Sequence, residues 1–126
     1  NVLRSSEIVS VLGDRLTDLS GGDALPLPVL AVRCKGVVSL ASNVAPADVS
    51  KLVDLWNAGD VAGARAQHQR LRELCETMFL ETNPGPVKAA MAMRGLMTGE
   101  IRLPLVAPSE ATLARVRKAV AGLGLS

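Results

Sequence analysis

The chain has 126 residues, enough for one ordinary domain or for part of a larger one. Hydrophobic residues make up 48% and charged residues 21%, which is typical of a globular protein and excludes a disordered one. The formal net charge of +2 indicates neither a nucleic-acid nor a membrane-surface partner, and an aromatic content of 2% argues against base stacking on single-stranded nucleic acid.

The first half of the chain is predicted to alternate between helix and strand. Ile8, Val11 and Leu12 recur at helical spacing and predict a helix over 3–13. Short strands are predicted over 15–20 and 36–41, the second apolar enough to be buried on both faces, with a helix over 27–34 between them. The separation of the two strands is long enough for a crossover, so they are predicted to pair in parallel.

The second half is predicted to be helical. A helix over 46–58 is followed by one that Asp60 caps and that extends to about residue 81. A third helix covers 87–95, and Ser109 caps a last one. Residues 102–105 are predicted to be extended because proline restricts the residue before it. The apolar stripe predicted for the helix after Asp60 comprises Val61, Ala64, His68, Leu71, Cys75 and Met78.

Two strands alone do not make a stable sheet, and no segment after Asn43 has the pattern of another strand. We therefore expect further strands to come either from preceding chain that is absent here or from another molecule. The mean hydropathy of +0.29 is also high for a small chain, whose compact monomer would expose roughly 6,000–6,500 Å². We expect the apolar faces to be covered by partner surface, as in a homo-oligomer, and the isolated chain to associate.

No run of about 18 apolar residues indicates a membrane span, and the first residues do not have the pattern of a secretory signal. Cys34 and Cys75 match no metal or redox spacing. We therefore expect a cytoplasmic protein with buried, reduced thiols, no metal site and no cofactor.

Four motifs resemble the carboxyl-terminal half of the dihydrodipicolinate synthase family, the pyruvate-dependent (β/α)8 aldolases that include N-acetylneuraminate lyase. They lie in order along the chain: Leu19-Ser20-Gly21-Gly22-Asp23; Gly36-Val37-Val38-Ser39 with Asn43-Val44-Ala45-Pro46; Phe79 to Lys88, containing Asn-Pro-Gly-Pro-Val-Lys; and Arg102-Leu103-Pro104-Leu105. The last two resemble the synthase branch more than the lyase branch.

The resemblance implies an α/β fold that is the last part of a TIM barrel. Residues 1–58 would form a partial barrel from its sixth to its eighth helix, with strands seven and eight at 15–20 and 36–41. Residues 59–126 would form the family's carboxyl-terminal helical region.

The resemblance also implies a lyase reaction of lysine biosynthesis. In this family pyruvate forms a Schiff base with a lysine on strand six and then attacks an aldehyde, which in the synthase is aspartate semialdehyde. That lysine would precede Asn1, and the family's tyrosine relay is absent because the chain has no Tyr. We therefore expect no catalytic residue in this chain and no activity from it alone.

The four lysines of the chain fit structural roles better than catalytic ones. Lys35 precedes the second strand, at the end of the barrel opposite the catalytic mouth, while Lys51 and Lys118 lie on solvated helix faces. Lys88 is expected to support the start of a helix rather than to react.

Gly21 and Val38 are the predicted substrate-binding residues. Gly21 and Gly22 end the first strand, where either a close approach of backbone to substrate or a turn with positive φ would require glycine, and a phosphate cradle is a weaker alternative. Val38 aligns with the family position whose main-chain carbonyl faces the pyruvyl group. Without the resemblance, its side chain would be interpreted as part of the core.

Other polar side chains have simpler interpretations. Asp18 and Asp23 flank the turn at the end of the first strand, and helix capping is a more common role for such aspartates than acid–base work. His68 is expected to be a packed, hydrogen-bonded core or interface residue rather than a ligand or base. Met91, Met93 and Met97 are expected to pack an Ala-rich helix.

Two other functions remain open from the sequence. The chain could belong to another pyruvate aldolase of the same superfamily, or it could be a non-catalytic half-barrel that associates with itself. Only the two aldolase hypotheses require a lysine from outside these residues.

Overall fold

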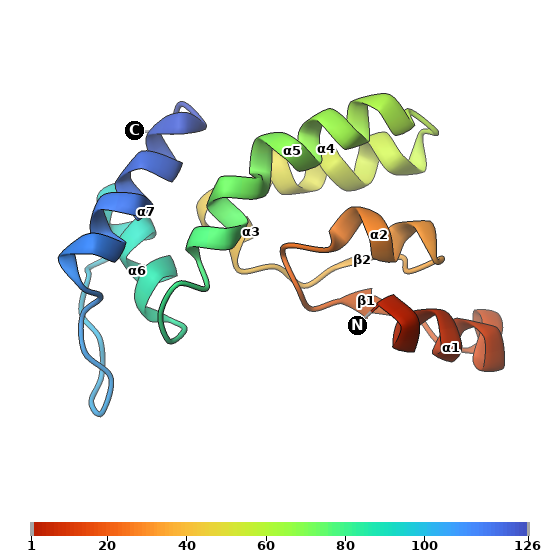
Figure 1. Ribbon diagram of the computed structural model, residues 1–126, viewed down its shortest axis with the longest axis horizontal. Coiled ribbons are helices and arrows are strands. Elements are labelled where there is room, and N and C mark those ends of the chain that lie inside the picture. Colours follow the sequence, from red (N-terminus) through yellow and green to blue (C-terminus); the bar gives the residue numbers. More distant parts are fainter. Residues whose placement is uncertain (1, 126) are drawn as a thin grey trace.

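The computed structural model describes residues 2–125. Helices dominate, and the sheet consists of two short strands (Figure 1). The elements in chain order are α1 (Val2–Leu12), the 3-10 turn η1 (Gly13–Arg15), β1 (Leu19–Ser20), α2 (Pro26–Ala31), β2 (Gly36–Val37), α3 (Ala41–Val44), α4 (Pro46–Asn57), α5 (Val61–Thr77), α6 (Gly85–Met93) and α7 (Glu110–Gly122).

The predicted parallel pairing is confirmed. Leu19 lies opposite Gly36 and Ser20 lies opposite Val37, with α2 as the connection. Two further backbone bonds extend the pairing beyond the strands, since Lys35 N donates to Asp18 O at 2.9 Å and Val38 N to Ser20 O at 2.7 Å. The carboxyl ends of both strands therefore lie side by side.

Both predicted strands are shorter in the structure. The turn η1 ends at Arg15, and within 15–20 only Leu19 and Ser20 pair as a strand. The strand predicted over 36–41 ends at Val37, because the backbone amides of Leu40 and Ala41 bond to the Asp23 side chain and the chain turns into α3. The sequence analysis did not predict α3. Helix α2 ends before Cys34 because Arg33 adopts a left-handed conformation, with φ of 77°.

The helices of the second half confirm most of the sequence prediction. Pro46 begins α4, and Gly59, with φ of +81°, follows its end. The predicted caps are present: Asp60 Oδ1 accepts a hydrogen bond from Gly63 N at 2.8 Å, and Ser109 Oγ accepts one from Thr112 N at 3.3 Å. Helix α5, however, ends at Thr77 instead of near residue 81. Residues 102–105 form a turn closed by Leu105 N to Arg102 O, so the extended prediction was wrong.

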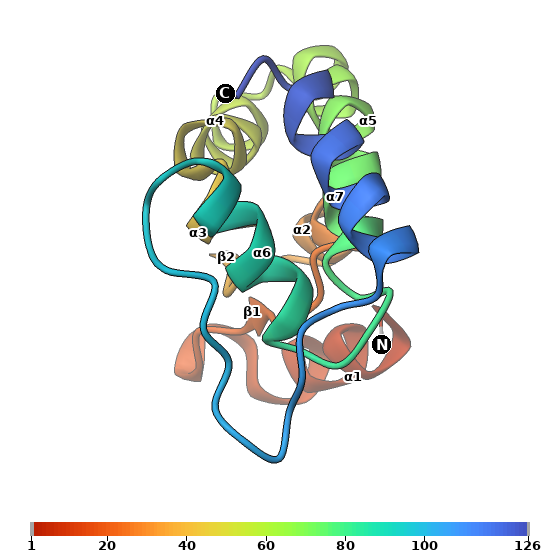
Figure 2. The same cartoon turned by 90° about the vertical axis from the view of Figure 1, so that its left-hand side faces the viewer.

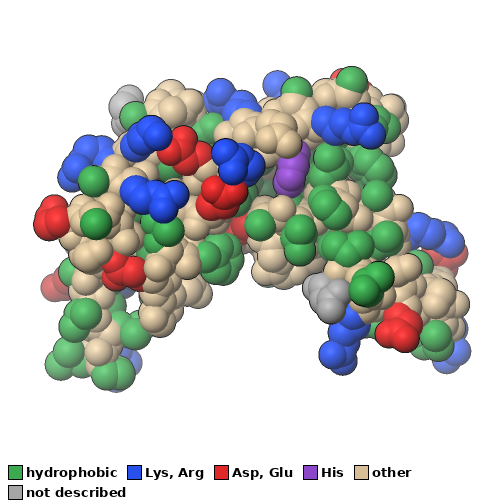
Figure 3. All heavy atoms as spheres, viewed as in Figure 1, with side chains coloured by type: hydrophobic (Ala, Val, Ile, Leu, Met, Phe, Trp, Pro, Cys, Tyr) green, Lys and Arg blue, Asp and Glu red, His purple; other side chains and the backbone are tan. Residues whose placement is uncertain are grey.

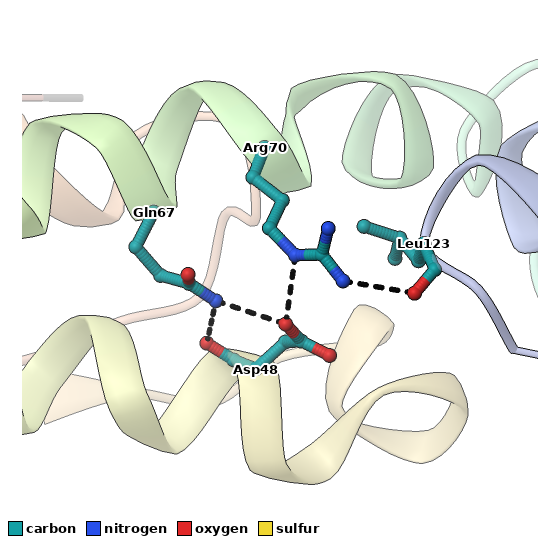
Figure 4. A network of polar contacts seen from close by, with 4 residues as sticks. All are labelled: Asp48, Gln67, Arg70 and Leu123. Atoms are coloured by element: carbon teal, nitrogen blue, oxygen red, sulfur yellow. Dashed lines mark hydrogen bonds and ion pairs between the residues drawn. The ribbon is translucent and has the colours of Figure 1, made fainter.

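One hydrophobic core joins the helices around α5. Its buried side chains come from α2 through α7 and include Leu52, Leu74, Met78 and Val116, each no more than 1% exposed. Helices α4 and α5 lie side by side in both ribbon views, and α7 packs against α5 (Figures 1 and 2). Polar contacts reinforce this junction, because Gln67 and Arg70 of α5 both bond to Asp48 of α4 (Figure 4).

The molecule has the shape of an arch. One leg of the arch consists of α1 and the two strands, and the other consists of α6, α7 and the loop over 94–109 (Figure 1). The space-filling view shows a hollow between these two legs (Figure 3). The accessible surface is 7473 Å², about 1,000 Å² above the value for a compact monomer of this mass. The accessible surface includes large apolar side chains, such as those of Leu16, which is 57% exposed, and Leu103, which is 81% exposed.

Candidate functional site

The candidate site lies at the carboxyl ends of β1 and β2. In parallel α/β architectures the loops after these ends build the functional sites. Here two loops contribute, Gly21–Asp23 after β1 and Val38–Leu40 after β2. The bond between Val38 N and Ser20 O holds the two loops together at their roots. The two predicted substrate-binding residues, Gly21 and Val38, thus follow neighbouring strands.

Gly21 and Gly22 are exposed, and neither is among the residues with positive φ. The alternative that this turn needs left-handed glycines is therefore wrong. Packing does not require glycine either, since a Cβ added at either position would meet no atom within 4 Å. The backbone conformation and the neighbours of these two residues would accept a side chain, because the space that each Cβ would occupy is open.

Val38 is the other exposed residue at this edge. Its side chain is 66% exposed, so it is not part of the core, contrary to what its apolar context indicates. Its amide is fixed by Ser20. Within the part of the chain that the structure describes, its carbonyl oxygen accepts no hydrogen bond. The site thus presents a free backbone acceptor beside a glycine loop.

Asp23 supports this edge from the buried side. The residue is 5% exposed, and its Oδ2 accepts hydrogen bonds from Leu40 N at 2.8 Å and Ala41 N at 3.1 Å. It borders an enclosed gap of about 10 Å³ that Cys75 also lines. Asp18 precedes β1 and accepts a hydrogen bond from Cys34 Sγ at 2.9 Å. The two aspartates do not form an acid–base pair, because they lie at opposite ends of β1 with separate partners.

The lysines are placed as expected. Lys35 precedes β2 and Lys51 is exposed on α4, while Lys118 of α7 forms an ion pair with Glu73 at 3.1 Å. Lys88 lies half-buried in the first turn of α6, where its backbone N donates to Pro84 O. No lysine belongs to either of the two loops that form the candidate site.

The thiols and the histidine have perturbed pKa values through burial. Burial raises the pKa of Cys75 to about 12, with help from the negative charge of Asp23. The pKa of Cys34 is raised by burial and by its hydrogen bond to Asp18. Both thiols are free and buried, as expected. These shifts disfavour the reactive thiolate.

His68 is half-buried on α5, and burial lowers its pKa. It forms no hydrogen bond to any residue between 2 and 125, so it is not a hydrogen-bonded core residue, and the interface alternative stays a prediction. Gln67, its neighbour in sequence, is a buried polar residue of this helix and bonds to Asp48. Of the methionines of the Ala-rich helix, Met91 packs against the core, whereas Met93 is 36% exposed.

Sequence reasoning missed a second anchoring carboxylate. Glu81 Oε1 accepts hydrogen bonds from Ser109 N at 3.0 Å and Ser109 Oγ at 2.6 Å, which ties the loop after α5 to the start of α7. Arg94, after α6, donates to Val44 O at the end of α3. Only their polar character marks these residues in the sequence, because their partners are distant along the chain.

Among residues 2–125, no group of three or more His, Cys, Asp or Glu side chains is arranged to hold a metal ion. The described helices are all too short or too polar to cross a membrane.

Comparison with known proteins places the chain in a family. The model of the dihydrodipicolinate synthetase family matches residues 1–122. The 4-hydroxy-tetrahydrodipicolinate synthase of Sorangium cellulosum is 49% identical over 120 residues, which are 95% of this chain and 40% of that protein. The chain thus spans less than half the length of this relative.

Solved structures of the family superpose closely. The crystal structure of dihydrodipicolinate synthase from Aquifex aeolicus is 42% identical, with a TM-score of 0.95 over 99% of this chain and 43% of that one. The chloride-inhibited enzyme from Acinetobacter baumannii, solved in complex with pyruvate, is 28% identical, with a TM-score of 0.94 over 100% of this chain and 43% of that one. The chain therefore belongs to the dihydrodipicolinate synthetase family.

Proposed function

We propose that this chain is the carboxyl-terminal part of a dihydrodipicolinate synthase, a lyase that condenses pyruvate with aspartate semialdehyde in lysine biosynthesis. Residues 1–58 contribute the last part of the barrel, and residues 59–126 form the helical region that follows it. The lysine that forms the Schiff base is supplied from outside residues 1–126.

The observation that carries the proposal is the pair of strand ends. Gly21 and Val38 lie on neighbouring loops, both are exposed, and Val38 offers a free carbonyl within the described chain. The backbone N–H groups of the glycine loop can donate to the carboxylate of a small 2-oxo acid, with no side chain in the way. The Val38 carbonyl can accept from the protonated nitrogen of the Schiff base that forms at the ketone carbon. The pyruvate complex of the Acinetobacter baumannii relative supports this substrate class.

The chain's own residues supply binding and orientation in this proposal. A lysine becomes nucleophilic when a buried environment lowers its pKa, and the four lysines here are half-buried or exposed. The reacting amine therefore comes from barrel strands outside residues 1–126. The loops after β1 and β2 hold pyruvate against this amine.

The open surface supports completion by further strands. Leu19 and Val38, in or next to the two strands, are exposed, and a groove between β2 and α4 is lined by Val37, Val49 and Val53. A sheet of this kind is stable when both faces and both edges are covered.

The experiment is a fusion. The part of the Sorangium cellulosum synthase that precedes the region matching this chain is joined to residues 1–126, and condensation of pyruvate with aspartate semialdehyde is assayed. We expect activity from the fused protein and none from residues 1–126 alone. A folded fusion without activity would overturn the proposal, as would activity of the isolated chain.

One alternative is favoured by a specific observation. The excess surface of about 1,000 Å² fits a half-barrel that associates with itself and has no catalytic role. A folded fusion that binds no pyruvate would favour this alternative. A folded fusion that binds pyruvate but condenses it with another aldehyde would favour a different aldolase of the superfamily.

A further inference from the structure

The peptide unit between Val38 and Ser39 is fixed from both sides. Before it, Val38 N donates to Ser20 O at 2.7 Å. After it, Leu40 N donates to Asp23 Oδ2 at 2.8 Å, and Ala41 N donates to the same oxygen at 3.1 Å. The carbonyl of Val38 belongs to this unit and accepts no hydrogen bond within the described chain. Its orientation therefore depends on these two anchors, together with Ser42, whose N donates to Ser39 Oγ at 2.9 Å and whose Oγ donates to Ser39 O at 2.7 Å.

Asp23 is the side-chain anchor of the pair, and its position is unusual. It is 5% exposed, and no Lys, Arg or His of residues 2–125 forms an ion pair with it. A buried carboxylate without a cation is costly to desolvate, so its two backbone partners are the interactions that retain it. These partners lie in the loop after β2, whereas Asp23 lies in the loop after β1.

We propose that Asp23 is a positioning residue that fixes the Val38 carbonyl at the carboxyl ends of the strands, where that carbonyl contacts the 2-oxo acid substrate. The inference rests on the proposed function. Asp23 does not touch the substrate. It joins the loop after β1, which contains Gly21, to the loop after β2, which contains Val38, so that the distance between the two loops stays fixed.

The chain offers a matched control for this role. Asp18 also bonds across from β1 to a neighbouring segment, through Cys34 Sγ at 2.9 Å, but it lies at the amino end of the strand. Asp18→Asn should leave the kinetics of the fused protein unchanged. Asp23→Asn keeps an acceptor oxygen in place and should retain substrate binding, whereas Asp23→Ala and Asp23→Ser remove the acceptor or withdraw it from reach.

The test is the kinetics of the fused protein with pyruvate varied, accompanied by thermal melting of each variant. In Asp23→Ala or Asp23→Ser we expect the KM for pyruvate to rise about tenfold or more, with a smaller loss in kcat and with Asp23→Asn close to the parent. A merely structural role would lower the melting temperature and the active fraction without moving the KM.

The outcomes separate the two proposals. If the parent fusion is active and the KM for pyruvate is unchanged in the folded Asp23→Ala or Asp23→Ser protein, the positioning role is wrong and the proposed function stands. If only Asp23→Asn folds, a KM raised by this variant would also contradict the role, since its oxygen can accept both hydrogen bonds. If the folded parent binds no pyruvate, the proposed function and the positioning role both fail.

Discussion

Arg70 joins three helices through an ion pair with Asp48 and a hydrogen bond to the backbone after α7. Arg70 Nε of α5 lies 3.1 Å from Asp48 Oδ1 of α4, and Arg70 Nη2 donates to Leu123 O, after α7, at 2.8 Å (Figure 4). The contact links α4, which follows the sheet, to the last helix of the chain.

Replacing Arg70 should destabilise this junction. Because Arg70 is about half exposed, solvent screens the ion pair, and the loss from Arg70→Met should be about 1 kcal/mol in the free energy of unfolding by urea. Arg65→Met is the matched control, since Arg65 is exposed on the same helix and forms no ion pair or hydrogen bond with any described residue. Equal losses in the two variants would show that the junction contributes nothing.

The core around α5 should be sensitive to cavities. Leu74 is 1% exposed and belongs to the cluster that joins the helices, so Leu74→Ala should lower the free energy of unfolding by about 2–5 kcal/mol. Val106 is 75% exposed, and Val106→Ala should change it by less than about 0.5 kcal/mol. Similar urea midpoints for both variants would contradict this packing.

The folded chain should become less stable as the pH is lowered through the range in which His68 takes up a proton. Burial lowers the pKa of His68 from 6.5, so the unfolded chain binds the proton more readily than the folded one. Stability is therefore unaffected above about pH 7.5 and declines as the pH falls through 6.5 towards the folded pKa. Melting temperatures of the parent and of His68→Gln, compared between about pH 7.5 and 5.5, should show a shallower decline in the variant. Parallel curves would mean that His68 titrates normally.

The two thiols should react slowly in the folded chain. The high pKa of Cys75, about 12, and its burial leave little thiolate at neutral pH, and Cys34 is also buried. Alkylation by iodoacetamide at about pH 8, followed by peptide mass spectrometry, should be at least about a hundredfold slower for Cys75 in buffer than in urea. Rapid labelling of Cys75 in buffer would show that the gap between Asp23 and Cys75 opens readily.

The sequence predicted those elements that depend on neighbours along the chain. Asp60 and Ser109 act within one turn of their own helices, and Gly59 ends a helix through its own φ, so local patterns identify them. The parallel pairing of the two strands followed from the order of strand, helix and strand.

The errors arise where a distant partner decides the local structure. Asp23 accepts hydrogen bonds from the backbone amides of residues 40 and 41, so the chain begins α3 there, although the apolar character of these residues is typical of a strand. The apolar neighbours of Val38, taken without the resemblance, indicate a buried side chain, but Val38 is exposed at the end of β2. The positions of Gly21 and Val38 in the candidate site came from the family resemblance, because their residue types carry no chemical signal of their own.

The most direct test of the central claim is borohydride trapping with labelled pyruvate. Reduction converts a lysine Schiff base into a stable covalent adduct that intact-mass measurement detects. We predict no adduct on residues 1–126 alone and one adduct on the fusion with the Sorangium cellulosum part, at a lysine outside these residues. An adduct on Lys35, Lys51, Lys88 or Lys118 of the isolated chain would contradict the account.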